Sequence, residues 1–237
     1  MKINTGTLES VTDLTLFGGA NAMAVESSLG QWEIVQAGEA ELIATGRYRL
    51  RRLLRGLRGT EAAMGAPTLT GSRVVVLDQA VTLLPMGLEE VGLAAEWRLG
   101  PASRPVGDES FAAVSFTPMG NGLRPFSPAH LRAQPLPDGS IAISWIRRTR
   151  DLAGDSWVLP EVPLGETSEV YELDICNAAG SILRAVTGLG APSFTYTSAM
   201  ISDDLSGFPQ PVAIRVAQIG VLGRGATAEM TLLIPSV

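Results

Sequence analysis

The sequence predicts an all-β chain built of two modules in succession. Segments in which apolar and polar residues alternate with a period of two recur along the chain, and turn residues separate them. The 237 residues include 26 glycines and 15 prolines, as expected for many turns between short strands. Only two stretches, 11–24 and 59–65, have a pattern that permits a turn or two of helix. We therefore expect a small β-barrel or β-sandwich followed by an immunoglobulin-like sandwich.

The first module, residues 1–122, is predicted to consist mostly of strands. They lie near residues 3–8, 22–26, 31–36, 39–44, 47–53, 72–77, 92–98 and 111–116. We expect Gly38 to form the tight turn between the third and fourth strands, because glycine readily adopts the positive φ of short hairpin turns. In the fifth strand, arginine alternates with other residues from Arg47 to Arg51, as in a half-buried strand.

A stretch rich in proline and glycine, residues 99–125, separates the two modules, and its last part, MGNGLRP, is predicted to be a linker. The second module, residues 123–237, contains seven strand-like segments: 125–136, 140–148, 168–177, 180–188, 192–201, 211–220 and 226–235. This spacing is typical of an immunoglobulin-like sandwich. Because there is no cysteine pair and a tryptophan lies on the second strand, we expect the fibronectin type III-like form.

Composition argues against several classes of function. One cysteine, Cys176, permits no disulfide within the chain, and together with a single histidine it cannot form a Cys/His zinc cluster. His130 has no expected partners for a catalytic triad, so we expect no catalytic residue, no metal and no cofactor. The net charge of −6 argues against nucleic acid as a partner. No segment approaches the roughly 18 apolar residues of a membrane span, so we expect no membrane insertion.

The stretch SWIRRTRDLAGDSW, residues 144–157, raises the question of a ligand site. Trp145 shares the apolar face of its strand with Ile141 and Ile143, so we expect it in the core. Trp157 lies outside any alternating segment and beside Asp155. An exposed ring next to a carboxylate can stack on a sugar while the acid binds hydroxyl groups. The alternative, which we favour, is that Trp157 covers the sandwich edge or contacts the first module.

The arginines of this stretch, Arg147, Arg148 and Arg150, lie at the strand end and in the loop, where a solvated position is the default expectation. The residues that we retain as candidate surface or ligand contacts are Trp157, Asp155, Arg148 and Arg150.

A second cluster of charge is the segment RYRLRRLLRGLRGT, which carries six arginines: Arg47, Arg49, Arg51, Arg52, Arg55 and Arg58. It permits an anion- or polysaccharide-binding patch, but we favour a strand with solvated or interfacial arginines. Three pairs of adjacent acids are interpreted as solvated turns, since neither the separation required for acid–base catalysis nor the spacing of a calcium loop is evident. These pairs are Glu89–Glu90, Asp108–Glu109 and Asp203–Asp204.

Several segments resemble one known family, in order and over nearly the whole chain. They are LESVTDLTLFGGANAMAV, GQWEIVQAGEAELIATGRYRLRRLLRGLRGTEAAMG, GSRVVVLD, EWRLGPASRPVGD, LRPFSPAHLRA and SWIRRTR…GDSW…EVPLGE…YELDI. The stretches 48–60 and 144–157 are the most specific. Together they resemble the C-terminal region of the host-specificity, "TIM-barrel-like" tail-tip protein of gene transfer agents and related siphophages.

The resemblance implies a non-enzymatic structural component of a phage-like tail tip or baseplate, which contributes to assembly and to attachment to the host cell. Residues 1–122 would then be a phage-tail domain. The implied partners are other tail and baseplate proteins and a bacterial surface polysaccharide, with a homotrimer in the assembled tail. The implied location is the tail tip of a virion-like particle made in the bacterial cytoplasm.

In this family a glycosidase-like barrel lies upstream, and the strand-like start of the chain, INTGTL, leads us to expect a piece of a longer protein. The alternative function is an accessory carbohydrate-binding module that serves such an upstream cell-wall glycosidase-like domain. A third hypothesis, a cell-wall hydrolase, is disfavoured by the lack of candidate catalytic residues.

Overall fold

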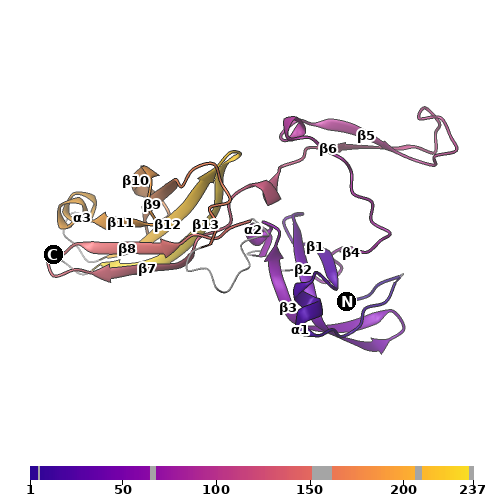
Figure 1. Ribbon diagram of the computed structural model, residues 1–237, viewed down its shortest axis with the longest axis horizontal. Helices are drawn as coiled ribbons and strands as arrows, with labels where there is room; N and C mark the ends of the chain where they lie inside the picture. Colours follow the sequence, from indigo (N-terminus) through magenta and orange to yellow (C-terminus); the bar gives the residue numbers. More distant parts are fainter. Residues whose placement is uncertain (5, 65–67, 151–161, 206–209, 235–237) are drawn as a thin grey trace. The chain divides into compact units, whose positions relative to one another are not determined.

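The computed structural model describes residues 1–4, 6–64, 68–150, 162–205 and 210–234 (Figure 1). The described chain consists mainly of antiparallel strands, which confirms the predicted all-β class. Its helical segments are short: α1 (Asp13–Phe17), α2 (Glu61–Met64), α3 (Ser198–Leu205) and the 3₁₀ turns η1 (Leu88–Glu90) and η2 (Asn121–Leu123). By its internal packing the chain divides into two units, one of Met1–Leu77 with Gly122–Val237 and one of Asp78–Asn121.

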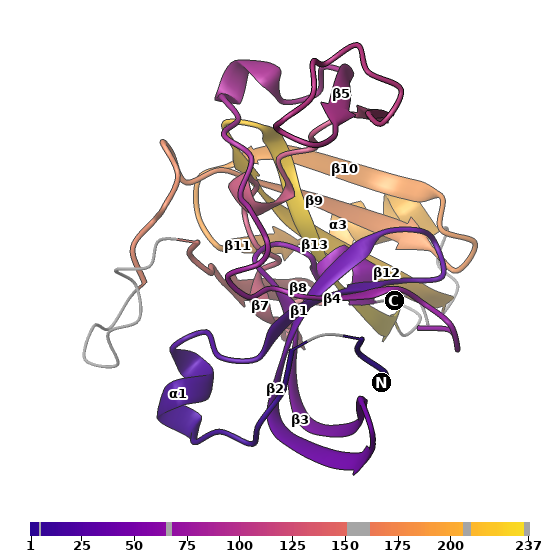
Figure 2. The same cartoon turned by 90° about the vertical axis from the view of Figure 1, so that its right-hand side faces the viewer.

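The N-terminal sheet has four antiparallel strands in the order β3-β2-β1-β4. They are β1 (Ala22–Glu26), β2 (Trp32–Ala44), β3 (Arg47–Leu57) and β4 (Val74–Val76). The long strands β2 and β3 curl along their length (Figure 2). Their concave face carries a small core built around Met23, Val35, Ala37 and Tyr48.

The expected turn at Gly38 is wrong, because β2 runs through this glycine without interruption. Gly38 faces Arg52 across the β2–β3 pair, where a Cβ atom would lie 3.2 Å from Leu16 Cδ2 and 3.3 Å from Arg52 Cβ. The chain instead turns at Gly46, whose φ is 64°. Glycine at position 38 therefore serves close packing.

The strand expected at residues 3–8 is also absent from the described part of that range. The chain there makes one isolated bridge, between Lys2 and Arg47, and the Ile3 amide donates to the Gly46 carbonyl at 2.9 Å. Ile3 and Leu8 are nevertheless buried, so the segment covers part of the sheet without joining it as a strand.

The unit Asp78–Asn121 contains a single antiparallel pair of strands, β5 (Ala95–Leu99) and β6 (Ala112–Phe116). Residues that face each other across the pair share one side of it. One side is therefore wholly apolar and carries Ala95, Trp97, Leu99, Ala112, Val114 and Phe116. All five residues of β6 are exposed, whereas Trp97 of β5 is partly buried, so much of this side is open.

The second module has the seven predicted strands, arranged as two sheets, β11-β8-β7 and β10-β9-β12-β13. They are β7 (Ala129–Pro135), β8 (Ile141–Ile146), β9 (Tyr171–Asn177), β10 (Ile182–Leu189), β11 (Ser193–Tyr196), β12 (Gln210–Gly220) and β13 (Gly223–Ile234). This division into three and four strands is that of a fibronectin type III-like sandwich.

The sandwich core joins residues from both sheets. Trp145 is only 4% exposed, which confirms its predicted core position. Its ring meets that of Tyr171 edge-on, with the centroids 5.2 Å apart and the planes at 74°. Most of the aliphatic core comes from alternate residues of β8, β9 and β12, namely Ile141, Ile143, Leu173, Ile175, Val212, Ile214 and Val216, and the rest comes from Ile201 and Leu205 of α3 and Ile234 of β13.

The segment predicted as one strand over 192–201 changes conformation partway. β11 ends at Tyr196, and α3 begins two residues later. The Thr197 hydroxyl oxygen accepts from the Met200 amide at 3.3 Å, and the Ser140 hydroxyl oxygen accepts from the Ser198 amide at 3.2 Å. These hydrogen bonds satisfy backbone amides that are free at the start of a helix. A search for period-two alternation does not detect such a helix start.

Candidate functional site

Two of the four candidate contact residues, Trp157 and Asp155, lie outside the described residues. The other two are engaged within the chain. Arg148 forms an ion pair with Glu61 of α2, and its guanidinium lies 5.1 Å from the centroid of the Phe126 ring. Arg150 donates from Nε to Glu166 Oε1 at 2.7 Å, and this hydrogen bond raises the pKa of Arg150.

The expectation of a solvated Arg147 is wrong. Its side chain is 18% exposed and donates from Nη1 to Glu169 Oε1 at 3.2 Å and from Nη2 to the Val162 carbonyl at 2.8 Å. Glu169 Oε1 in turn accepts from the Tyr171 hydroxyl at 2.8 Å. Burial, followed by this hydrogen bond, raises the pKa of Tyr171. The network connects the end of β8 to the sandwich core, so Arg147 stabilises the module.

Three of the six arginines of this segment, Arg49, Arg52 and Arg55, form ion pairs with acids of the N-terminal part of the chain. In the β2–β3 register Glu41 lies opposite Arg49, and their side chains form an ion pair at 3.1 Å. Arg52 pairs with Asp13 of α1. These contacts favour the structural interpretation of the segment over an anion-binding patch along its whole length.

A buried carboxylate, Glu33, was not singled out by the sequence analysis. It is 2% exposed and accepts from Arg55 Nε at 2.9 Å, from Arg55 Nη2 at 2.6 Å and from the Gly56 amide at 3.0 Å. The bonds raise the pKa of Arg55, since they favour the charged guanidinium. Because three donors bind its carboxylate, Glu33 has a structural role. The alternation of residues in β2 does not predict that this acid is buried.

Asp204 corrects another expectation, since it does not lie in a solvated turn. It belongs to α3, and its carboxylate accepts from Arg184 Nε at 2.7 Å, Arg184 Nη2 at 3.0 Å and the Tyr196 hydroxyl at 2.8 Å. Burial and the bond to Asp204 raise the pKa of Tyr196. Within the described residues, no group of three or more His, Cys, Asp or Glu side chains is placed to hold a metal ion.

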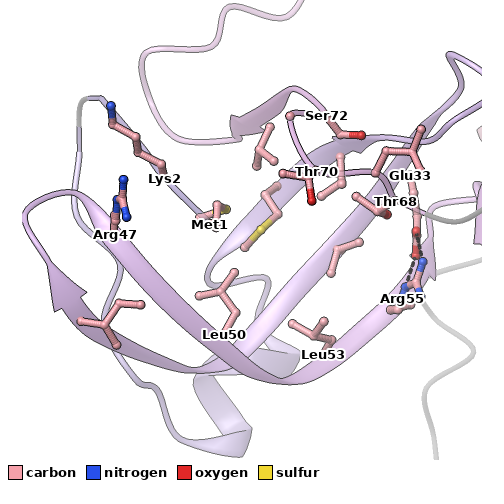
Figure 3. Close-up of a pocket in the computed structure, with 17 residues that line it drawn as sticks. Met1, Lys2, Glu33, Arg47, Leu50, Leu53, Arg55, Thr68, Thr70 and Ser72 are labelled. Carbon is pink, nitrogen blue, oxygen red and sulfur yellow. Dashed lines mark hydrogen bonds and ion pairs between the residues drawn. The ribbon is translucent and has the colours of Figure 1, made fainter.

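The concave face of the N-terminal sheet is hollowed by a cavity of about 770 Å³, which we call the sheet groove (Figure 3). Leu50 and Leu53 lie along its middle. Lys2 and Arg47 lie at one end, and the Glu33–Arg55 pair lies at the other. The remaining lining residues come from the chain start, from β1, β2 and β4, and from the segment that leads into β4: Met1, Met23, Val25, Val35, Ile43, Thr68, Leu69, Thr70, Gly71, Ser72 and Val74.

Together these features define the class of the protein as an all-β chain, in which a four-stranded antiparallel sheet precedes, and a fibronectin type III-like sandwich follows, a unit with two strands. None of the described helices is both long and apolar enough to cross a membrane.

Comparison with known families relates the first part of the chain to one of them. Residues 1–75 match the family "Rcc01698-like, C-terminal". The matched range ends inside β4 and so covers almost all of the N-terminal sheet. No match was found among curated protein sequences.

Several solved structures are weakly similar to the chain. Domains d3–d4 of the rat CD45 extracellular region share 11% identity, with 97% of this chain and 99% of that chain covered and a TM-score of 0.34. The FN5 domain of Drosophila Lar shares 18% identity over 48% of this chain and 99% of that chain, with a TM-score of 0.30. The FN1–FN3 domains of chicken CNTN1 share 11% identity over 91% of this chain and 56% of that chain, with a TM-score of 0.33. Because these TM-scores are low, the fold class is assigned from the strand order described above and not from these similarities.

Proposed function

We propose that the chain is a structural component of the tail tip or baseplate of a phage-like particle of the gene transfer agent type. There it contributes to assembly and to attachment of the particle to the host cell surface. The observation that carries the proposal is the match of residues 1–75, since that family name is associated with gene transfer agents. The ordered resemblance of the later segments to the same tail-tip protein extends the argument beyond the matched range.

The unit Asp78–Asn121 supports a role in assembly. Phe116 and Leu99 are 50% and 52% exposed on the apolar side of the β5–β6 pair. A two-stranded sheet is at best marginally stable alone, and exposed apolar surface of this kind is typical of protein contacts. Other tail and baseplate proteins are the partners that we propose, with a homotrimer in the assembled tail. The chain would be made in the bacterial cytoplasm and located at the tail tip.

Attachment to a bacterial surface polysaccharide is the finer part of the proposal. Its candidate residues Trp157 and Asp155 lie outside the described part of the chain, and the guanidinium groups of Arg148 and Arg150 already have acidic partners. No described observation therefore favours the accessory carbohydrate-binding alternative over the assembly role.

Immunogold labelling of purified particles with an antibody against this chain tests the assignment. We expect gold at the tail end distal to the head. Gold along the tail tube or on the head would contradict the proposal. Attachment is tested separately by retention of the purified chain on host cell envelopes, with Trp157→Ala compared with Trp32→Ala as a matched control. Equal retention of both variants and the unaltered chain would remove Trp157 from the attachment surface.

A further inference from the structure

The sheet groove is apolar over its middle because the normal alternation of β3 is broken there. Residues of a regular strand point alternately to opposite faces, so Leu50 and Leu53 should lie on different faces. Arg52, between them, has a φ of 54°, and Gly38 lies opposite it in β2. This left-handed residue reverses the alternation, so both leucines line the same cavity. The sheet thereby presents a longer apolar strip than its sequence pattern predicts.

The floor of the groove is packed, whereas its wall is open. Met23 and Val35 are buried at 1% and 4% exposure. Leu53 and Ile43, which line the same cavity, are 45% and 51% exposed. Large apolar side chains left open above a solid floor favour occupation by an apolar group, because covering them removes hydrocarbon from water.

Charge is distributed unequally along the groove. At one end Glu33 is already satisfied by Arg55 and the Gly56 amide. At the other end, Lys2 and Arg47 are exposed, and no carboxylate in the described part of the chain lies within ion-pair distance of either. The open end therefore has two uncompensated positive charges beside an apolar strip.

From this arrangement we propose that the sheet groove binds a single-chain anionic amphiphile, a fatty acid. The carboxylate lies between Lys2 and Arg47, and the hydrocarbon chain follows Leu50 and Leu53 towards the Glu33–Arg55 pair. The cavity of about 770 Å³ lies within the range of about 300–1,000 Å³ that is typical of small-molecule pockets. This inference does not depend on the tail-tip role and can fail or succeed independently of it.

Titration calorimetry of the whole chain with octanoate, decanoate and laurate, each below its micelle concentration, tests the proposal. We expect saturable binding with a stoichiometry of one, and a decrease in Kd of about fourfold for each methylene buried. Methyl NMR should place the shifts at Met23, Leu50 and Leu53. Dodecanol provides the uncharged control, since Arg47→Gln should weaken laurate about tenfold and leave dodecanol unchanged.

The matched pair of variants is Leu53→Glu in the groove and Leu233→Glu on β13, because both leucines are exposed and neither replacement disturbs a core. We expect Leu53→Glu to weaken laurate binding more than tenfold and Leu233→Glu to leave it unchanged. The absence of saturable binding, or equal effects of the two variants, would overturn the proposal. Sedimentation that revealed a dimer abolished by Leu53→Glu but insensitive to laurate would also overturn it and assign the groove to a contact between copies.

Discussion

The sandwich and the N-terminal sheet are built from similar amphipathic strands, but their apolar faces are covered differently. In the sandwich, two sheets face each other, and residues such as Leu173 and Val216 are fully buried. In the N-terminal sheet, a chain segment and short loops cover part of one face, and Leu53 stays half exposed. A sheet without a facing sheet retains open apolar surface, and in this molecule that surface is the groove.

The two regions also place their charged groups differently. The sandwich joins Arg184 to Asp204 at the side of β10 and α3, with a buried tyrosine hydroxyl as a further donor. The N-terminal sheet places Glu33 on the face that carries the groove and satisfies it with Arg55. In both pairs the carboxylate is held by an arginine side chain, so each pair contributes to the order of its module.

The largest effect is expected from the sandwich core. Trp145→Ala should lower the free energy of unfolding by about 3–5 kcal/mol, because it removes a buried ring and leaves a cavity beside Tyr171. Urea denaturation monitored by circular dichroism measures the change. A loss below about 1 kcal/mol would mean that the two sheets are not packed as described.

Asp204→Ala should have the next largest effect, a loss of about 2–4 kcal/mol, because Arg184 and the Tyr196 hydroxyl lose their common acceptor. The neighbouring Asp203→Ala is the control, since Asp203 is exposed, and we expect its free energy of unfolding to change by less than about 0.5 kcal/mol. Denaturation curves that were equal for the two variants would refute the buried role of Asp204.

In the N-terminal sheet, Glu33→Gln should cost about 1–3 kcal/mol, since the amide cannot accept from Arg55 and Gly56 as the carboxylate does. Glu41→Gln removes an exposed pair with Arg49 and should cost less than about 0.5 kcal/mol. Hydrogen exchange of the β2 and β3 amides compares the two variants within this sheet. Similar protection of these amides in the two variants would contradict the inference that the buried Glu33 contributes more to stability than the exposed Glu41.

The stability of the sandwich should depend on pH at alkaline values. The pKa values of Tyr171 and Tyr196 are raised in the folded state, first by burial and then by bonds to Glu169 and Asp204. Their contribution to stability is therefore fully present below about pH 10, the ordinary tyrosine pKa, and is lost as the pH rises towards the folded values. We expect a slope of up to about 1.4 kcal/mol per pH unit for each tyrosine. Tyr196→Phe should reduce the slope measured by denaturation between pH 9 and 11.

Apart from the control variants, the smallest effect on stability is expected from the groove. Leu53→Ala should change the free energy of unfolding by less than about 1 kcal/mol, because a half-exposed side chain leaves no closed cavity when it is shortened. Thermal unfolding provides the measurement. A loss as large as that of Trp145→Ala would show that the groove is a closed core and would remove the contrast between the two regions.

Strand content was the most predictable feature of the molecule. Period-two alternation located all seven sandwich strands and placed Trp145 in the core, because a strand with one buried face must alternate. Gly38 was misread for a physical reason. Glycine permits both a tight turn and close packing, and only the neighbouring Leu16 and Arg52 distinguish the two uses.

The partners of charged residues were the least predictable feature. Arg147 and Asp204 have acidic or basic partners 22 and 20 residues away along the chain, which no local pattern reports. The groove was missed for a related reason, since the alternation of β3 is broken at Arg52, whose φ is positive, and Leu50 and Leu53 therefore line the same cavity.

The sequence by itself therefore determined the all-β class, the strand periods and the fibronectin type III-like module, because these follow from local alternation and turn chemistry. Only the tertiary structure decided which acid neutralises which arginine and which apolar face stays open. Those outcomes depend on how strands that are distant in the sequence align and on whether a second sheet covers the first. Alternation marks a face as apolar, but what lies against that face is a property of the folded chain.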